Sequence, residues 1–158
     1  MSINDNKVMC NGGTSAELVA KVAAGGKVKA IWSQWTHAQG PVMIDQDGME
    51  APPLSGTAWG TAKVLKNLYW ESTLPSTLAA GNYLVRHELL ALHQANTPQF
   101  YAECAQIQVT GSGTAQPSSD YLTTIPGYAA QSDPGVTVDT YSSAITTYTC
   151  PGPKVWTG

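Results

Sequence analysis

Residues 81–91 read Gly-Asn-Tyr-Leu-Val-Arg-His-Glu-Leu-Leu-Ala, and residues 105–110 read Ala-Gln-Ile-Gln-Val-Thr. Short runs of this kind, rich in Val, Ile, Thr and Tyr, recur along the chain between clusters of Gly, Pro, Asn and Ser. The pattern predicts an all-β sandwich rather than alternating strands and helices. Two more strands are predicted at 18–22 and 27–33, with Gly25-Gly26 as a hairpin turn between them.

Helical spacing is present only from Thr57 to Tyr69, where apolar residues recur every three or four positions and Thr57 is a candidate N-cap. We therefore expect at most one short helix. After Gly111, frequent Gly and Pro residues predict a long loop-rich segment that wraps the core and carries surface residues for binding.

The composition limits the classes of function. The 158 residues predict a single domain, 1–158. Only 12% of residues are charged, and a polar but uncharged surface is common in secreted carbohydrate-active proteins. A net charge of −3 with eight scattered Lys and Arg residues argues against a nucleic-acid partner. No apolar run approaches the length of a membrane span.

The cysteines are Cys10, Cys104 and Cys150. They lie too far apart for the paired spacing of a structural zinc site. Their odd number is consistent with one disulfide and one unpaired thiol, and three reduced, buried thiols remain an alternative.

The histidines are His37, His87 and His93. If one strand continued through residue 93, His87 and His93 would share a face and could point at one site. A zinc hydrolase with two histidines and Glu88 or Glu103 stays open, although the H-E-x-x-H motif is absent. A glycosidase pair cannot be chosen from the acidic residues Asp45, Asp47, Glu50, Glu71, Glu88 and Glu103.

Longer motifs carry a resemblance to a known family. Residues 81–93 followed by 98–113 resemble the auxiliary activity family 9 lytic polysaccharide monooxygenases, formerly classed as family 61 glycoside hydrolases. Three other segments agree with this resemblance, which extends from about Lys7 onward: 35–42, 125–128 with 132–135, and 148–156.

The resemblance implies an immunoglobulin-like β-sandwich that binds one copper ion and oxidatively cleaves cellulose or a related β-glucan. In the family, a histidine brace holds the metal: the N-terminal histidine gives its amino nitrogen and a ring nitrogen, and a second histidine completes the set. The second histidine corresponds to His37 and the axial tyrosine to Tyr101. His93 and Gln99 correspond to polar groups beside the metal. Imidazole nitrogens with a weak axial oxygen suit Cu(II).

The same resemblance implies further properties. It implies a disulfide between Cys10 and Cys104, with Cys150 unpaired, and it gives His87 no ligand role. It also implies a secreted, fungal-type monomer that needs an external electron donor.

Two departures from the family pattern stand out. The chain starts with Met1 instead of the brace histidine, and it has no secretory signal. A family loop with its own disulfide is missing after Val42-Met43. We therefore expect a chain that is truncated at the N-terminus and impaired in oxidative cleavage. The alternative is a non-catalytic polysaccharide-binding sandwich, in which Tyr141, with Tyr148 and Trp156, stacks on sugar rings.

Overall fold

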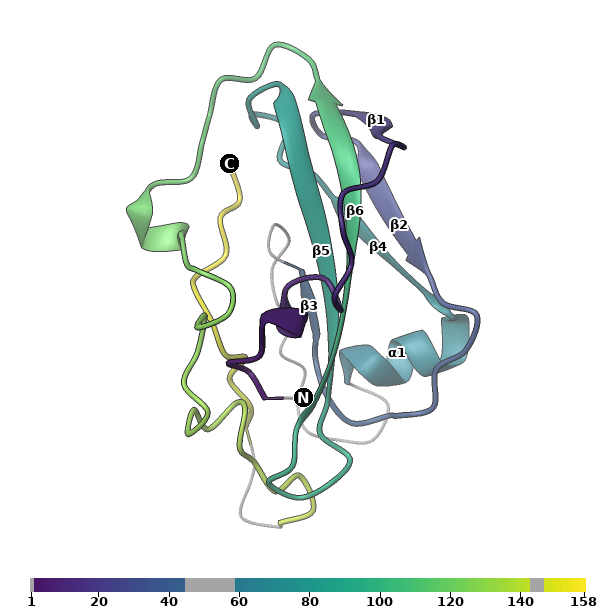
Figure 1. The fold of residues 1–158 in the computed structure, drawn as a ribbon, viewed down its shortest axis with the longest axis vertical. Coiled ribbons are helices and arrows are strands. Elements are labelled where there is room, and N and C mark those ends of the chain that lie inside the picture. Colours follow the sequence, from purple (N-terminus) through teal and green to yellow (C-terminus); the bar gives the residue numbers. More distant parts are fainter. Residues whose placement is uncertain (1, 45–58, 143–146) are drawn as a thin grey trace.

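The computed structural model describes residues 2–44, 59–142 and 147–158, and these residues form two packed β-sheets (Figure 1). The larger sheet has the strand order β1-β6-β5-β3, and the smaller sheet pairs β2 with β4. The strands are β1 (Ala20–Ala23), β2 (Lys27–Ile31), β3 (Val42–Ile44), β4 (Tyr69–Thr73), β5 (Gly81–Ala91) and β6 (Gln99–Thr110). The helical elements are α1 (Gly60–Asn67) and two single 3₁₀ turns, η1 (Asn6–Val8) and η2 (Ser119–Tyr121). The predicted all-β class with one short helix is confirmed.

The predicted hairpin at Gly25-Gly26 is wrong. A turn does occur there, closed by a hydrogen bond of 2.8 Å from Gly26 N to Ala23 O. However, β1 pairs in parallel with β6, whereas β2 pairs antiparallel with β4. The turn therefore carries the chain from one sheet to the other. Gly26 suits this crossing because a Cβ there would lie 2.7 Å from Ala23 O.

The helix is shorter than predicted. It begins at Gly60 after Trp59, and Thr57 lies outside the described residues. It ends at Leu68, which has a left-handed backbone (φ 59°) and donates its N–H to Val64 O. Tyr69 then pairs with Ile31 of β2. Strand pairing at Tyr69 thus overrides the helical spacing of the sequence.

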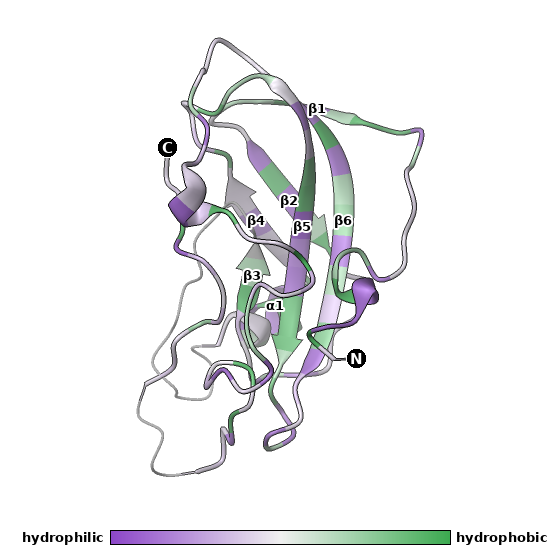
Figure 2. Ribbon diagram, turned by 60° about the vertical axis from the view of Figure 1, so that its left-hand side comes forward, coloured by the Kyte–Doolittle hydropathy of each residue, from purple (hydrophilic) through white to green (hydrophobic). Residues whose placement is uncertain are grey.

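Strand β5 lies at the centre of the molecule, and both of its faces are covered. Leu89 packs with Val42 and Val64 on the side of the smaller sheet. Leu90 faces the other side, where it packs with Phe100 and with residues of the C-terminal segment such as Val136. Hydrophobic and hydrophilic residues interleave along β5 and β6 (Figure 2). The C-terminal segment therefore closes the second face of the larger sheet, as its loop-rich sequence predicts.

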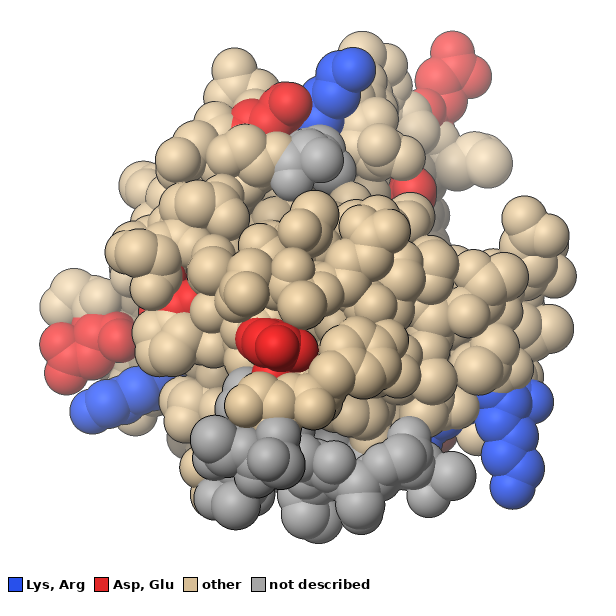
Figure 3. Space-filling view, turned by 90° about the horizontal axis from the view of Figure 1, so that it is seen from below, with Lys and Arg blue, Asp and Glu red and all other residues tan. Residues whose placement is uncertain are grey.

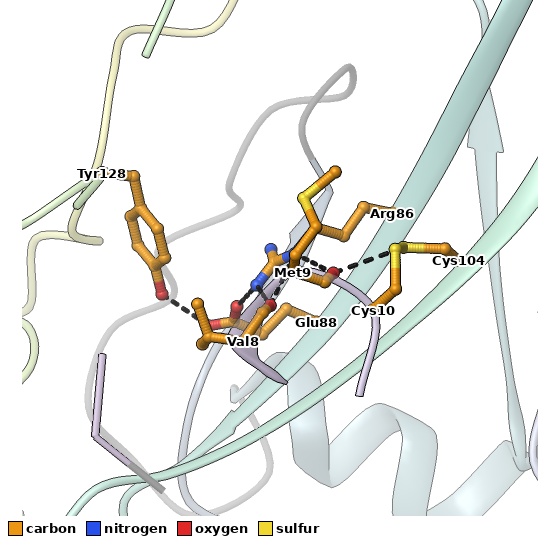
Figure 4. A network of polar contacts seen from close by, with 7 residues as sticks. All are labelled: Val8, Met9, Cys10, Arg86, Glu88, Cys104 and Tyr128. Atoms are coloured by element: carbon orange, nitrogen blue, oxygen red, sulfur yellow. Dashed lines mark hydrogen bonds and ion pairs between the residues drawn. A yellow bond between two sulfur atoms is a disulfide. The ribbon is translucent and has the colours of Figure 1, made fainter. Parts of the chain in front are cut away.

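Two buried connections hold the N-terminal segment to the larger sheet (Figure 4). The first is a disulfide between Cys10 and Cys104, the pair that the family resemblance implies, while Cys150 is free and buried. The second is an ion pair between Arg86 and Glu88, whose exposed fractions are 2% and 0%.

Polar partners surround this ion pair. Arg86 donates from Nη2 to Val8 O at 2.6 Å and from Nε to Met9 O at 2.9 Å. The Tyr128 hydroxyl donates to Glu88 Oε1 at 2.7 Å. The charges are thus compensated inside the core, as buried charges must be. Among the described residues, no helix is long and apolar enough to span a membrane.

Candidate functional site

Four of the predicted site residues meet where β5 ends and β6 begins, at the lower end of Figure 1. The rings of His37 and His93 stack with their centroids 3.8 Å apart and their planes at 6°. The Tyr101 hydroxyl lies 3.4 Å from His37 Nε2 and donates to Gln99 Oε1 at 2.7 Å. The structure thus brings together two imidazoles, a phenol and an amide.

Strand geometry places Gln99 and Tyr101 together. In the β5–β6 pairing, Gln99 lies opposite Ala91 and Tyr101 lies opposite Leu89. Residues two apart on a strand point to the same side. Gln99 and Tyr101 therefore share one face at the end of the sheet.

A close backbone approach brings the loop of His37 to β5. Leu92 donates its N–H to Gln39 O at 2.9 Å, directly before His93. Gly40 lies against Leu90, so that an added Cβ would be 1.8 Å from Leu90 O. Its φ of +134° also falls in the region that glycine adopts readily. Only glycine permits this approach, which places His37 beside His93.

Trp35 orients His37 and Tyr101. Its ring makes edge contacts to both, with centroid distances of 5.2 Å to His37 and 5.1 Å to Tyr101. Its indole N–H donates to the carbonyl of His37 at 2.5 Å. The sequence pattern does not single out Trp35, although its place two residues before His37 in an aromatic segment is a usable signal. With Trp32 and Glu103, these side chains line a hollow of ≈ 240 Å³.

The electrostatic setting favours neutral nitrogen donors. Burial, and secondly the neighbouring His93, hold the pKa of His37 below its usual value. The imidazole therefore stays unprotonated and able to bind a metal at neutral pH. His93 Nδ1 is buried and has no hydrogen-bond partner in the described part of the chain. The described residues contain no group of three His, Cys, Asp or Glu side chains that could hold one ion, which removes support for the zinc-hydrolase alternative.

His87 and His93 do not share a site, because β5 ends at Ala91 and His93 lies beyond it. His87 packs instead against Trp32, with ring centroids 6.4 Å apart. Burial lowers the pKa of His87 to about 4.

This buried histidine predicts an acid-sensitive stability. Because its pKa falls from an ordinary 6.5 to about 4, the unfolded chain binds a proton that the folded chain refuses as the pH drops through this window. We expect a loss of about 2 to 3 kcal/mol at pH 4.5 relative to pH 7 from this group. Urea unfolding of wild type and His87→Leu at both pH values measures it. The variant should lose less stability, and equal losses would contradict the assignment.

The aromatic residues of the binding-module alternative differ in exposure. Tyr141 is 63% exposed, and its hydroxyl donates to the carbonyl of His93 at 2.9 Å, which holds it at the same end of the molecule. Tyr148 is buried against Trp59 and donates to Gly135 O. Trp156 is partly buried against the core cluster that contains Leu74 and Leu78. Tyr148 therefore cannot stack on a sugar ring.

Comparison with known proteins identifies the class. The model of Auxiliary Activity family 9 (formerly GH61) matches residues 42–148. Over 189 residues the chain is 43% identical to AA9 family lytic polysaccharide monooxygenase D of Thermothelomyces thermophilus, a match that covers 100% of this chain and 74% of that protein. It is 45% identical to AA9 family lytic polysaccharide monooxygenase B of Heterobasidion irregulare, covering 91% of this chain and 69% of the relative.

A solved structure supports the same assignment. The crystal structure of a cellulose-active polysaccharide monooxygenase from M. thermophila superposes with a TM-score of 0.89 at 43% identity, covering 99% of this chain and 82% of that one. The chain belongs to Auxiliary Activity family 9. The β-sandwich expected from the resemblance is the fold of this family.

Proposed function

We propose that this single domain, 1–158, is the scaffold of a copper-dependent lytic polysaccharide monooxygenase that acts on cellulose or a related β-glucan. His37 and Tyr101 are the proposed copper ligands, and His93 and Gln99 the proposed catalytic groups beside them. The observation that carries the proposal is the meeting of these four side chains at one end of the sandwich.

The donor chemistry fits copper. A neutral imidazole at His37 and a phenol oxygen at Tyr101 match the nitrogen donors and weak axial oxygen that Cu(II) accepts. His93 Nδ1, buried without a partner, adds an unsatisfied nitrogen beside them. The third histidine of the chain, His87, lies against Trp32 and does not contribute. Two imidazoles that stack face to face cannot supply a full square of nitrogens, so we propose that these residues alone bind copper weakly and that oxidation is impaired.

Each residue has a role that its contacts define. Bound copper would supply one-electron redox chemistry. The Tyr101 hydroxyl spends its proton on Gln99 Oε1, which leaves its oxygen free to approach a metal held by His37. The amide nitrogen of Gln99 then remains a donor for a polar reaction partner. Trp35 keeps the His37 ring in place through its backbone carbonyl.

The surface at this end suits a neutral polysaccharide. Figure 3 views the molecule from this end, and charged side chains are sparse there. We propose that the exposed ring of Tyr141, tied to His93, contacts a sugar ring. The M. thermophila relative is described as cellulose-active, and we extend this substrate to the present chain. We further propose a secreted monomer that receives electrons from an external donor.

The alternative function is non-catalytic binding of a polysaccharide. The exposure of Tyr141 and the small number of nitrogen donors favour it for this chain. Electron paramagnetic resonance separates the two: a copper site gives an axial Cu(II) signal, and a binding module gives none.

We predict that His37→Ala weakens copper binding about 10- to 100-fold, whereas His87→Ala changes it little. Calorimetry with Cu(II) measures both, and circular dichroism confirms that each variant is folded. Equal losses from the two substitutions would contradict the choice of ligand. Mass spectrometry of swollen cellulose treated with ascorbate and peroxide tests the activity. We expect at most traces of oxidised oligosaccharides, and abundant products abolished by His37→Ala would contradict the proposed impairment.

A further inference from the structure

The smaller sheet leaves part of the larger sheet uncovered. On the side of β6 that faces the smaller sheet, three alternate residues are exposed: Tyr101, Glu103 and Ala105. Their direct neighbours on β5 are all buried: Leu89, His87 and Val85. Strands β2 and β4 therefore cover β5 but stop short of β6. The sandwich has space for one more strand in its smaller layer.

An open groove occupies this space. It has a volume of ≈ 380 Å³ and runs between β2 and β6, which lie beside each other in Figure 1. Val28 and Trp32 line it from β2 and the residue that follows, and Glu103 and Ala105 line it from β6. Within the described residues, β2 pairs only with β4, so its other edge faces the groove. An unpaired strand edge offers backbone donors and acceptors to an added strand.

His87 gives this groove an unsatisfied polar group. Its side chain lines the groove and is 5% exposed, and Nε2 has no hydrogen-bond partner among the described residues. A buried polar atom without a partner is costly, and a ligand that hydrogen-bonds to it recovers that cost. This observation is independent of the open edge, and it points to an occupant with polar groups as well as apolar ones.

We infer that the β2 edge is a docking site for an extended peptide strand that carries acidic side chains on its outer face and small apolar side chains on its inner face. The backbone of the peptide pairs with β2, which is the mode of recognition by strand addition. Its outer side chains lie beside the exposed Lys27 and Lys29. Its inner side chains cover Ala105 and Val28. The site is separate from the proposed copper ligands and does not depend on them.

The same lysines disfavour a second copy of the chain as the occupant. Symmetric antiparallel pairing of two β2 strands centred on Lys29 places Lys29 opposite Lys29, and centring on Val28 places Lys27 opposite Lys29. Like charges directly opposite one another destabilise a strand pair, and lysines on edge strands block edge-to-edge association. An acidic partner meets no such repulsion.

A synthetic peptide tests the site. The probe is the acetylated and amidated octapeptide Thr-Glu-Val-Glu-Val-Glu-Val-Thr, and the control replaces each Glu by Lys. Calorimetry should show saturable binding of the acidic peptide and much weaker binding of the basic one. Hydrogen exchange of the β2 amides should slow when the acidic peptide binds. Equal binding of both peptides, or protection outside β2, would overturn the proposal.

Matched variants locate the binding. Ala105→Arg fills the groove and should abolish binding, whereas Thr110→Arg places the same side chain on the same strand outside the groove and should not. Lys29→Glu should weaken the acidic peptide about fivefold, and Lys21→Glu on β1 serves as its charge control. Light scattering of the free protein completes the test: self-association that Ala105→Arg abolishes would assign the edge to a second copy and refute the peptide site.

Discussion

Replacing Arg86 by methionine is expected to lower the free energy of unfolding by about 3 to 5 kcal/mol. Arg86 and Glu88 are almost completely buried, so the substitution leaves a carboxylate inside the core without its cation. Tyr128 still donates to Glu88, but one hydroxyl cannot replace a guanidinium. The carbonyls of Val8 and Met9 also lose their donor, so the N-terminal segment is held less firmly.

Chemical denaturation of four proteins measures this effect: wild type, Arg86→Met, Glu88→Leu and the double variant. The double variant removes both charges and should be more stable than the sum of the single losses predicts. Tyr128→Phe is the control for a single hydrogen bond and should cost about 1 to 3 kcal/mol. A loss below 1 kcal/mol for Arg86→Met would mean that water reaches Glu88 and that the pair is not a core element.

Residue composition predicts the strands but not how they pair. The runs at 81–91 and 105–110 are confirmed within β5 and β6, because Val, Ile and Tyr favour extended backbone locally. β1 shows where this reasoning ends. Its pairing with β6 joins Ala20 to Ile107, which lie far apart in the chain. Such pairing depends on nonlocal packing, so a local Gly-Gly turn suggests a hairpin that the fold does not form. β3 and β4 are short and gain their stability from neighbours, and local composition does not mark them.

The candidate site was predictable for a different reason. Residue types alone left three histidines without a choice among them, and motif resemblance selected His37, His93, Gln99 and Tyr101. The structure brings these four together because Gly40 allows the loop of His37 to reach β5. The role of Trp35 and the open edge of β2 depend on distances between segments, which no local pattern contains. The Arg86–Glu88 pair is similar: alternation in a strand marks 86 and 88 as one face, but not as a buried one.

The second large effect is expected from the disulfide. Replacing Cys10 and Cys104 by alanine should lower the free energy of unfolding by about 4 to 5 kcal/mol, because the bond closes a loop spanning 94 residues and restricts the unfolded chain. Against a typical stability of about 5 to 15 kcal/mol, this loss leaves many of the molecules unfolded at moderate temperature. Peptide mapping without reduction checks the pairing, and a Cys10–Cys150 peptide would refute it.

The matched control is Cys150→Ala, because Cys150 is also buried but free, and burial raises its pKa to about 12. Its loss should be that of one small apolar side chain, well below the loss from removing the disulfide. The disulfide and the Arg86 contacts hold the same segment, since Val8 and Met9 directly precede Cys10. Their energies should therefore be coupled: once the disulfide is absent, Arg86→Met should cost less than it does in the wild type. Additive losses in thermal and chemical unfolding would show that the two connections act independently, and that residues 8–10 do not dock as one unit.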